Sequence, residues 1–267
     1  RQTDTASIAR NYYEEGMRFY YPSVNWREDG PGYVESEFPL YPYMVALLYE
    51  GFGGVEESLG RLVSVVFGLF TVLLLYLFSF RLFKNSAMAF ISGMVYAISP
   101  LCIFYNRAFM PESLMMFCSI AGLYYFYSWI HGENSRQWAG AILFLSLAML
   151  LKLTNAMLFI PMAGILMDRH GFKFYRWGKF VIIFLLVAAF TAAWYIHAYG
   201  LYLKTHLSFG ILADTGLNKW ISLDTLKNFD FITTLGFRIF SIDLTPAGAI
   251  FCLLGIGAGI RHPSLST

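Results

Sequence analysis

The stretch LVSVVFGLFTVLLLYLFSF, residues 62–80, decides the fold class, because it is nineteen residues long and carries no charge. At a rise of about 1.5 Å per residue, a helix of this length nearly covers the roughly 30 Å hydrocarbon core of a membrane. The chain of 267 residues is 57% hydrophobic and only 13% charged, whereas soluble domains are about 25% charged. The sequence therefore predicts an all-α integral membrane protein.

Further apolar spans follow this stretch along the chain. They cover residues 87–105, 112–130, 138–151, 154–167, 180–198 and 244–260. Counting residues 62–80, five of the seven spans are long enough, or nearly long enough, to cross the membrane. The two spans on either side of Lys152 are ambiguous, since a single helix over both would be about 45 Å long, too long without severe tilt.

The charges of the short loops favour a hairpin at Lys152. With this hairpin, one side of the membrane receives eight basic residues and only two acids in short loops, which makes it the cytoplasmic side. A single helix over residues 138–167 would instead put the basic cluster at 169–179 opposite Arg81 and Lys84. The eight basic residues are Arg81, Lys84, Arg136, Arg169, Lys173, Arg176, Lys179 and Arg261.

This topology divides the chain into four parts. Residues 1–60 form an extracytoplasmic loop that holds ten of the seventeen acids. Residues 61–198 form transmembrane helices, residues 199–243 a second extracytoplasmic loop, and residues 244–267 a last transmembrane helix with a cytoplasmic end. Since the chain begins within a polar stretch and stops just after an apolar one, we expect it to be a piece of a longer protein.

Two amphipathic helices are predicted in the first part. A helix over residues 3–18, with Thr3 as its N-cap, puts Asp4 in the first turn, where the helix dipole favours an anion. A second helix over residues 40–52 begins after Pro39 and is rich in Tyr and Leu, which is typical of a helix lying in the membrane interface.

Acidic and basic side chains gather at the extracytoplasmic ends of the predicted spans. Fixed carboxylates beside fixed cations suit a reaction in which an acceptor is deprotonated while an anionic leaving group, such as phosphate, departs. The candidate residues are Asp4, Glu35, Glu37, Arg107, Glu112 and Lys152.

Each candidate also has a structural explanation. Acids in a polar surface loop are usually solvated. Lys152 lies between two apolar halves, so it is either functional or extends its long side chain to the membrane surface. Arg107 and Glu112 are five residues apart across a proline, and the two would equally form an ion pair that clasps two helices.

Four motifs resemble those of a known family. They are Arg-Gln-Thr-Asp-Thr-Ala-Ser-Ile-Ala-Arg-Asn at 1–11, Glu-Phe-Pro-Leu-Tyr-Pro-Tyr at 37–43, Arg-Ala-Phe-Met-Pro-Glu at 107–112 and Leu-Lys-Leu-Thr-Asn at 151–155. Over roughly residues 1–170, the chain resembles the dolichyl-phosphate-mannose-protein mannosyltransferase family. This group of GT-C glycosyltransferases includes the bacterial aminoarabinose transferases that act on lipid A.

The resemblance implies a multi-spanning GT-C helical bundle, of which this chain would lack the first helix. It also implies sugar transfer from a polyprenyl-phosphate carrier to an acceptor lipid, glycan or protein. The reaction would take place on the extracytoplasmic side of a bacterial or archaeal plasma membrane.

The same resemblance implies roles for the candidate residues. Asp4 would be the base or an acceptor ligand and Glu37 its partner, although many members have adjacent Asp and Glu where this chain has a single Asp4. The other candidates would bind the substrate, with the two cations on the phosphate; they are Lys152, Arg107, Glu112 and Glu35.

No cofactor is expected with certainty, and a divalent cation is left open. The net charge of +2 gives no general attraction to nucleic acid.

The rival hypothesis is a transporter or flippase for a lipid-linked anion, and a structural membrane subunit is a third. A transporter should bury ionisable residues near mid-span in interrupted helices, whereas here only Lys152 breaks a long apolar run.

Overall fold

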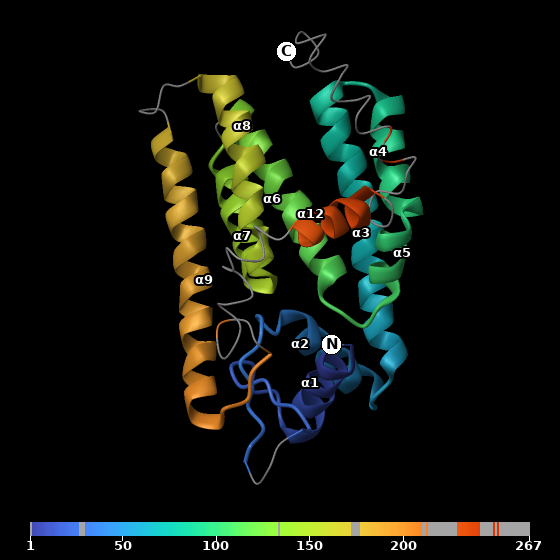
Figure 1. The fold of residues 1–267 in the computed structure, drawn as a ribbon, viewed down its shortest axis with the longest axis vertical. Helices are drawn as coiled ribbons and strands as arrows, with labels where there is room; N and C mark the ends of the chain where they lie inside the picture. Colours follow the sequence, from blue (N-terminus) through green and yellow to red (C-terminus); the bar gives the residue numbers. More distant parts are fainter. Residues whose placement is uncertain are drawn as a thin grey trace.

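The computed structural model describes residues 2–26, 30–132, 134–171, 177–209, 212, 229–240, 248 and 250. In these residues, α3 to α9 form an upright bundle, and α1 and α2 lie together at one end of it (Figure 1). The helices are α1 (Gln2–Glu15), α2 (Leu40–Phe52), α3 (Glu57–Phe83), α4 (Ser86–Ile98), α5 (Pro100–Arg107), α6 (Glu112–Gly132), α7 (Ser135–Leu151), the 3-10 helix η1 (Leu153–Leu158), α8 (Phe159–His170), α9 (Gly178–Thr205) and α12 (Phe229–Arg238).

The bundle has the character of a membrane domain. Among the described residues, α3, α6 and α9 are long and apolar enough to cross a membrane, and α4 with α5 makes a fourth span if this bent pair is counted as one. Large apolar side chains point outward from these helices, as at Leu69, which is 64% exposed. Such outward apolar surface suits a lipid environment, so the predicted all-α membrane class is confirmed.

The predicted apolar span at residues 87–105 is present, but it is bent. This stretch forms α4 and α5, which meet at an angle of 63°. Pro100 is the first residue of α5. Because proline has no N–H to donate and its ring clashes with the preceding turn, a helix cannot run straight through it.

The long apolar run around Lys152 is broken, as predicted. α7 ends at Leu151, and Lys152 has extended backbone angles before η1 and α8 begin. Residues near the ends of α6 and α8, such as Trp129 and Leu166, share one apolar core, so α8 runs alongside α6 and opposite to α7. The two short spans around Lys152 correspond to α7, which has 17 residues, and to α8, which has 12. Of the five spans predicted to be of nearly membrane length, four correspond to α3, the bent pair α4 and α5, α6 and α9, and the fifth, at 244–260, lies outside the described residues apart from 248 and 250.

The described residues before α3, which are 2–26 and 30–56, form a cap on the bundle. α2 has the predicted bounds, whereas α1 ends at Glu15, ahead of Gly16 with a φ of 107°. The predicted N-cap at Thr3 is wrong, because α1 already includes Gln2.

The far end of the chain is described only in part. α9 continues to Thr205, past the predicted end of its span at residue 198. The helix α12 falls inside the predicted second loop. The predicted last span at 244–260 lies outside the described residues, apart from residues 248 and 250.

Candidate functional site

One apolar core joins the cap to the bundle. It contains buried side chains from five helices and from the turn before α6. These include Ala9 of α1, Tyr41 of α2, Val63 of α3, Phe109 of the turn, Leu114 of α6 and Leu151 of α7. Because this core fixes the cap against the helix ends, polar residues at these ends have defined positions.

The turn between α5 and α6 is anchored to α3. The Ser64 Oγ donates to the carbonyl oxygen of Ala108 at 2.7 Å. The hydroxyl of Tyr41 lies 2.8 Å from the same Oγ and donates to the carbonyl oxygen of Gly60 at 2.7 Å. Burial raises the pKa of Tyr41, so this hydroxyl keeps its proton and remains a donor. These bonds fix the position at which α6 begins, with Glu112 as its first residue.

The turn after α7 is fixed by Asn155. Its Nδ2 donates to the carbonyl oxygen of Ala148 at 2.7 Å, and its Oδ1 accepts from the Ser119 hydroxyl at 3.3 Å. Its backbone N–H donates to the carbonyl oxygen of Lys152 at 3.1 Å. The asparagine thereby connects the turn to both α6 and α7. Its hydrogen bonds fix the backbone of the turn that carries Lys152.

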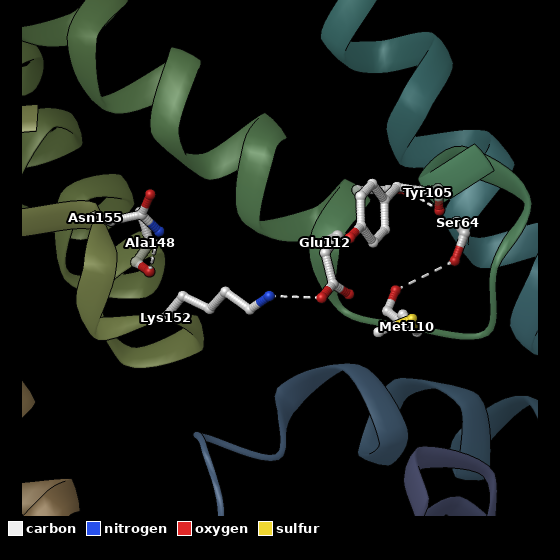
Figure 2. A network of polar contacts seen from close by, with 8 residues as sticks. Ser64, Tyr105, Met110, Glu112, Ala148, Lys152 and Asn155 are labelled. Atoms are coloured by element: carbon white, nitrogen blue, oxygen red, sulfur yellow. Dashed lines mark hydrogen bonds and ion pairs between the residues drawn. The ribbon is translucent and has the colours of Figure 1, made fainter. Parts of the chain in front are cut away.

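Lys152 and Glu112 meet at this junction, although they are forty residues apart in the sequence (Figure 2). The Lys152 Nζ lies 2.5 Å from the Glu112 Oε1, and the two side chains are 21% and 10% exposed. Glu112 stands at the N-terminus of α6 and Lys152 at the C-terminus of α7, so each charge is favoured by the dipole of its own helix. The other carboxylate oxygen, Glu112 Oε2, is buried and has no hydrogen-bond partner among the described residues.

The ion pair between Lys152 and Glu112 excludes two structural explanations that the sequence left open for these residues. Glu112 pairs with Lys152 and not with Arg107, so the alternative of a clasp across Pro111 is wrong. Lys152 does not simply extend to the surface, because its ammonium is held by a mostly buried carboxylate.

The segment at 35–38 lies between the ends of α7 and α9. The backbone N–H of Phe38 donates to the carbonyl oxygen of Leu150 at 3.1 Å, and the indole N–H of Trp194 donates to the carbonyl oxygen of Ser36 at 3.1 Å. Glu37, which is half-buried, directly precedes Phe38, and Leu150 is two residues from Lys152. The backbone next to Glu37 is thus bonded to α7 two residues before Lys152.

Glu35 is committed to contacts within the protein. It is fully buried, and its carboxylate accepts hydrogen bonds from the Ser208 hydroxyl and from the backbone N–H of Leu212, the latter at 2.8 Å. Its backbone bonds with Leu207 and Phe209. Glu35 therefore fastens the chain after α9 to the cap, and substrate binding by this residue stays a prediction.

Asp4 belongs to α1 and Arg107 to α5. Asp4 is half-buried in the first turn of α1. Gln2, in the same turn, lines a pocket together with Arg107, which is exposed at the end of α5. Of the six candidates, the structure joins Lys152 to Glu112 directly, and Glu35 is bonded to the chain after α9. Arg107 shares a pocket with Gln2, two residues before Asp4.

Three supporting residues were not predicted. Asn155 belongs to the quoted motif at 151–155, and Ser64 is one of four hydroxyl residues in the span 62–80, but their partners Ser119 and Ala108 are distant in sequence. Arg61, which lines the pocket beside Arg107, resembles an ordinary charge at the start of a span.

In the described ranges, no group of three or more His, Cys, Asp or Glu side chains could hold a metal ion.

Comparison with known proteins identifies a family. The family model of dolichyl-phosphate-mannose-protein mannosyltransferases matches residues 31–197, which include Glu35, Glu37, Arg107, Glu112 and Lys152 but not Asp4. No curated protein and no solved structure matches the chain. Since the matched residues make up more than half of the sequence, the chain belongs to the dolichyl-phosphate-mannose-protein mannosyltransferase family.

Proposed function

We propose that the protein transfers a sugar from a polyprenyl-phosphate carrier to an acceptor hydroxyl at the extracytoplasmic end of the bundle. Membership of the family implies a membrane glycosyltransferase of the GT-C type; the carrier, the acceptor and the side of the membrane are our proposals. The observation that carries them is the Lys152 ammonium, held beside Glu112 where the cap meets the bundle. An ammonium has three N–H donors, so two remain for a phosphate after the bond to Glu112.

The proposed reaction needs a cation for the phosphate, which is Lys152, and a carboxylate for the proton of the acceptor. The acceptor oxygen forms a bond to the anomeric carbon while the bond from that carbon to the phosphate oxygen breaks. The phosphate leaves with the bonding electron pair, and Lys152 stabilises the negative charge that grows on it. The proton of the acceptor hydroxyl passes to a carboxylate, which acts as general base.

Asp4 is our proposed base or acceptor ligand, with Glu37 as its partner. The bond between Phe38 and Leu150 supports a place for Glu37 near Lys152. The family match begins after Asp4, which gives Glu37 a claim to the base role as well. Glu112 is a positioning residue in this scheme, because it acts by holding Lys152.

An apolar groove supports the choice of a lipid carrier. It lies between α7 and α9, has a volume of about 760 Å³, and includes Phe38, Leu150 and Phe190 in its lining. Along α7 it extends from Trp138 to Leu150, a length of about 18 Å for a helix. The groove begins next to the junction, so an isoprenoid chain lying in it would present its phosphate near Lys152.

The function can be tested with the full-length protein in lipid nanodiscs. A polyprenyl-phosphate sugar carrying a labelled sugar is added with candidate acceptors, and released lipid phosphate and labelled product are both measured. Sugar transfer gives both products in equal amounts. The rival hypothesis, a transporter for a lipid-linked anion, would be supported instead if vesicles with the protein moved the carrier across the membrane without cleaving it.

A further inference from the structure

A small polar cleft opens on the cap, where the loop between α1 and α2 folds back beside the end of α1. It has a volume of about 100 Å³, which is room for several water molecules. Among the described residues, no Leu, Ile, Val or Phe lines this cleft, so it suits a polar ligand. The side chains in its lining include Asn11 and Glu15 of α1 and Arg18, Tyr21, Ser23 and Tyr33 of the loop.

The walls of the cleft are held by hydrogen bonds within the cap. Across the loop, the backbone N–H of Val24 donates to the carbonyl oxygen of Gly32 at 2.9 Å, and that of Val34 donates to the carbonyl oxygen of Pro22 at 3.0 Å. The Asn11 Nδ2 donates to the carbonyl oxygen of Ser23 at 3.0 Å and so connects the loop to α1. Because the walls are fixed before a ligand arrives, binding costs little ordering of the protein.

Two tyrosine rings form the aromatic part of the cleft. The ring centroids of Tyr21 and Tyr33 lie 5.1 Å apart, and their planes are tilted by 46°. Tyr21 is 43% exposed, so part of its ring is open to a ligand. The face of an aromatic ring is electron-rich and attracts the weakly positive C–H groups of a sugar ring.

The charges in the cleft favour a neutral ligand over an anion. Arg18 supplies the positive charge; its Nη1 donates to the Tyr33 hydroxyl at 3.5 Å, and a guanidinium has five N–H donors in all. Glu15 is exposed and is the last residue of α1, whose C-terminal end carries a partial negative charge. A phosphate therefore gains no clear net attraction here. A donor and an acceptor side by side suit neighbouring hydroxyl groups, because each hydroxyl both donates and accepts.

We propose that this cleft binds one sugar unit of a neutral glycan. The sugar ring lies against Tyr21 and Tyr33, and its hydroxyl groups bond to Arg18 and Glu15. Lys152, Glu112 and Glu37 do not line the cleft. Binding of the glycan therefore does not require sugar transfer at the junction.

Free trisaccharides test this site directly. The full-length protein is placed in phosphatidylcholine nanodiscs without any lipid-linked sugar, and binding of mannotriose, maltotriose and chitotriose is measured by saturation-transfer NMR. The wild type should bind at least one of them. Tyr21→Ala should bind it about three- to tenfold more weakly through loss of the ring contact, and Arg18→Gln about tenfold more weakly through loss of charge-assisted hydrogen bonds. Tyr21→Phe keeps the ring and should bind like the wild type.

The control variant is Arg10→Gln, which removes an exposed arginine of α1 that does not line the cleft. It should bind like the wild type. The proposal would be overturned if the wild type bound none of the three trisaccharides, if Tyr21→Ala or Arg18→Gln kept full affinity, or if Arg10→Gln lost as much as Arg18→Gln. Displacement of the trisaccharide by inorganic phosphate would also overturn it, since the cleft would then be an anion site. Because no sugar donor is present, none of these results bears on the proposed transferase function.

Discussion

Replacing Lys152 by methionine should affect stability and catalysis separately, because the lysine both neutralises Glu112 and is our proposed ligand of the leaving phosphate. Methionine keeps the length of the side chain and removes the ammonium. The Glu112 Oε1 then loses its partner at 2.5 Å, and the Oε2 already has none. The variant thus leaves a mostly buried carboxylate without any compensating charge.

The size of the stability loss follows from this burial. Removing one partner of a buried ion pair typically costs about 3–5 kcal/mol. The Lys152 side chain is 21% exposed and that of Glu112 10%, so some water reaches the pair and the lower end of that range, about 3 kcal/mol, is expected. The catalytic loss is independent of it. Loss of a group that stabilises developing charge should raise the barrier by about 2–4 kcal/mol, which lowers turnover about 30-fold to 1,000-fold.

A matched double variant separates the two losses. In Lys152→Met with Glu112→Gln both charges are gone, so the thermal melting temperature of the purified protein should return most of the way to the wild-type value. Turnover at saturating lipid donor should stay low, because the ammonium is still absent. Lys152→Arg should keep the ion pair and recover part of the activity, since the guanidinium is larger and planar.

The informative comparison is between melting temperature and turnover in the double variant. If both return to the wild-type values together, Lys152 only neutralises Glu112, and its proposed contact with the phosphate is refuted. Equal turnover in the wild type, Lys152→Met and Lys152→Arg would refute it as well.

The remaining predictions concern the base and the framework of the junction. If Asp4 is the base, Asp4→Asn should lower turnover about 10²-fold to 10⁴-fold while donor binding survives, and a fully active Asp4→Asn with an inactive Glu37→Gln would assign the role to Glu37. Asn155→Ala should cost about 1–3 kcal/mol in stability and lower turnover without abolishing donor binding, because it frees the turn that carries Lys152; unchanged melting and turnover would contradict this. Gly68→Ala should destabilise the protein by about 1–3 kcal/mol in thermal melting, since an added Cβ would lie 2.6 Å from the Asn106 Cγ, and a wild-type melting temperature would show that Asn106 can move aside.

The sequence predicts those features that depend on residues close together in the chain. The bounds of α2 followed from a proline at its start and an apolar, Tyr-rich run, and the break at Lys152 followed from the length of the apolar run and the loop charges. The bend between α4 and α5 cannot be predicted from hydropathy, because both helices are apolar. Pro100 was a visible signal for it.

Pairing between distant residues could not be predicted in the same way. Arg107 is five residues from Glu112 and seemed the natural partner by sequence distance, but the actual partner is Lys152, forty residues away. Glu35 and Glu37 are equivalent by sequence, yet one is fully buried and bonded to Ser208 while the other is half-buried. Such differences depend on how whole helices pack, and no local pattern records them.

The bend at Pro100 also changes how deep this span reaches. α4 has 13 residues and α5 has 8, so a straight helix of their combined length would be about 32 Å long. With α4 along the membrane normal and α5 turned by 63°, the pair covers only about 25 Å, less than the roughly 30 Å of hydrocarbon. A bilayer around α4 and α5 must therefore thin locally, or Arg107 must draw headgroups and water inward to reach it.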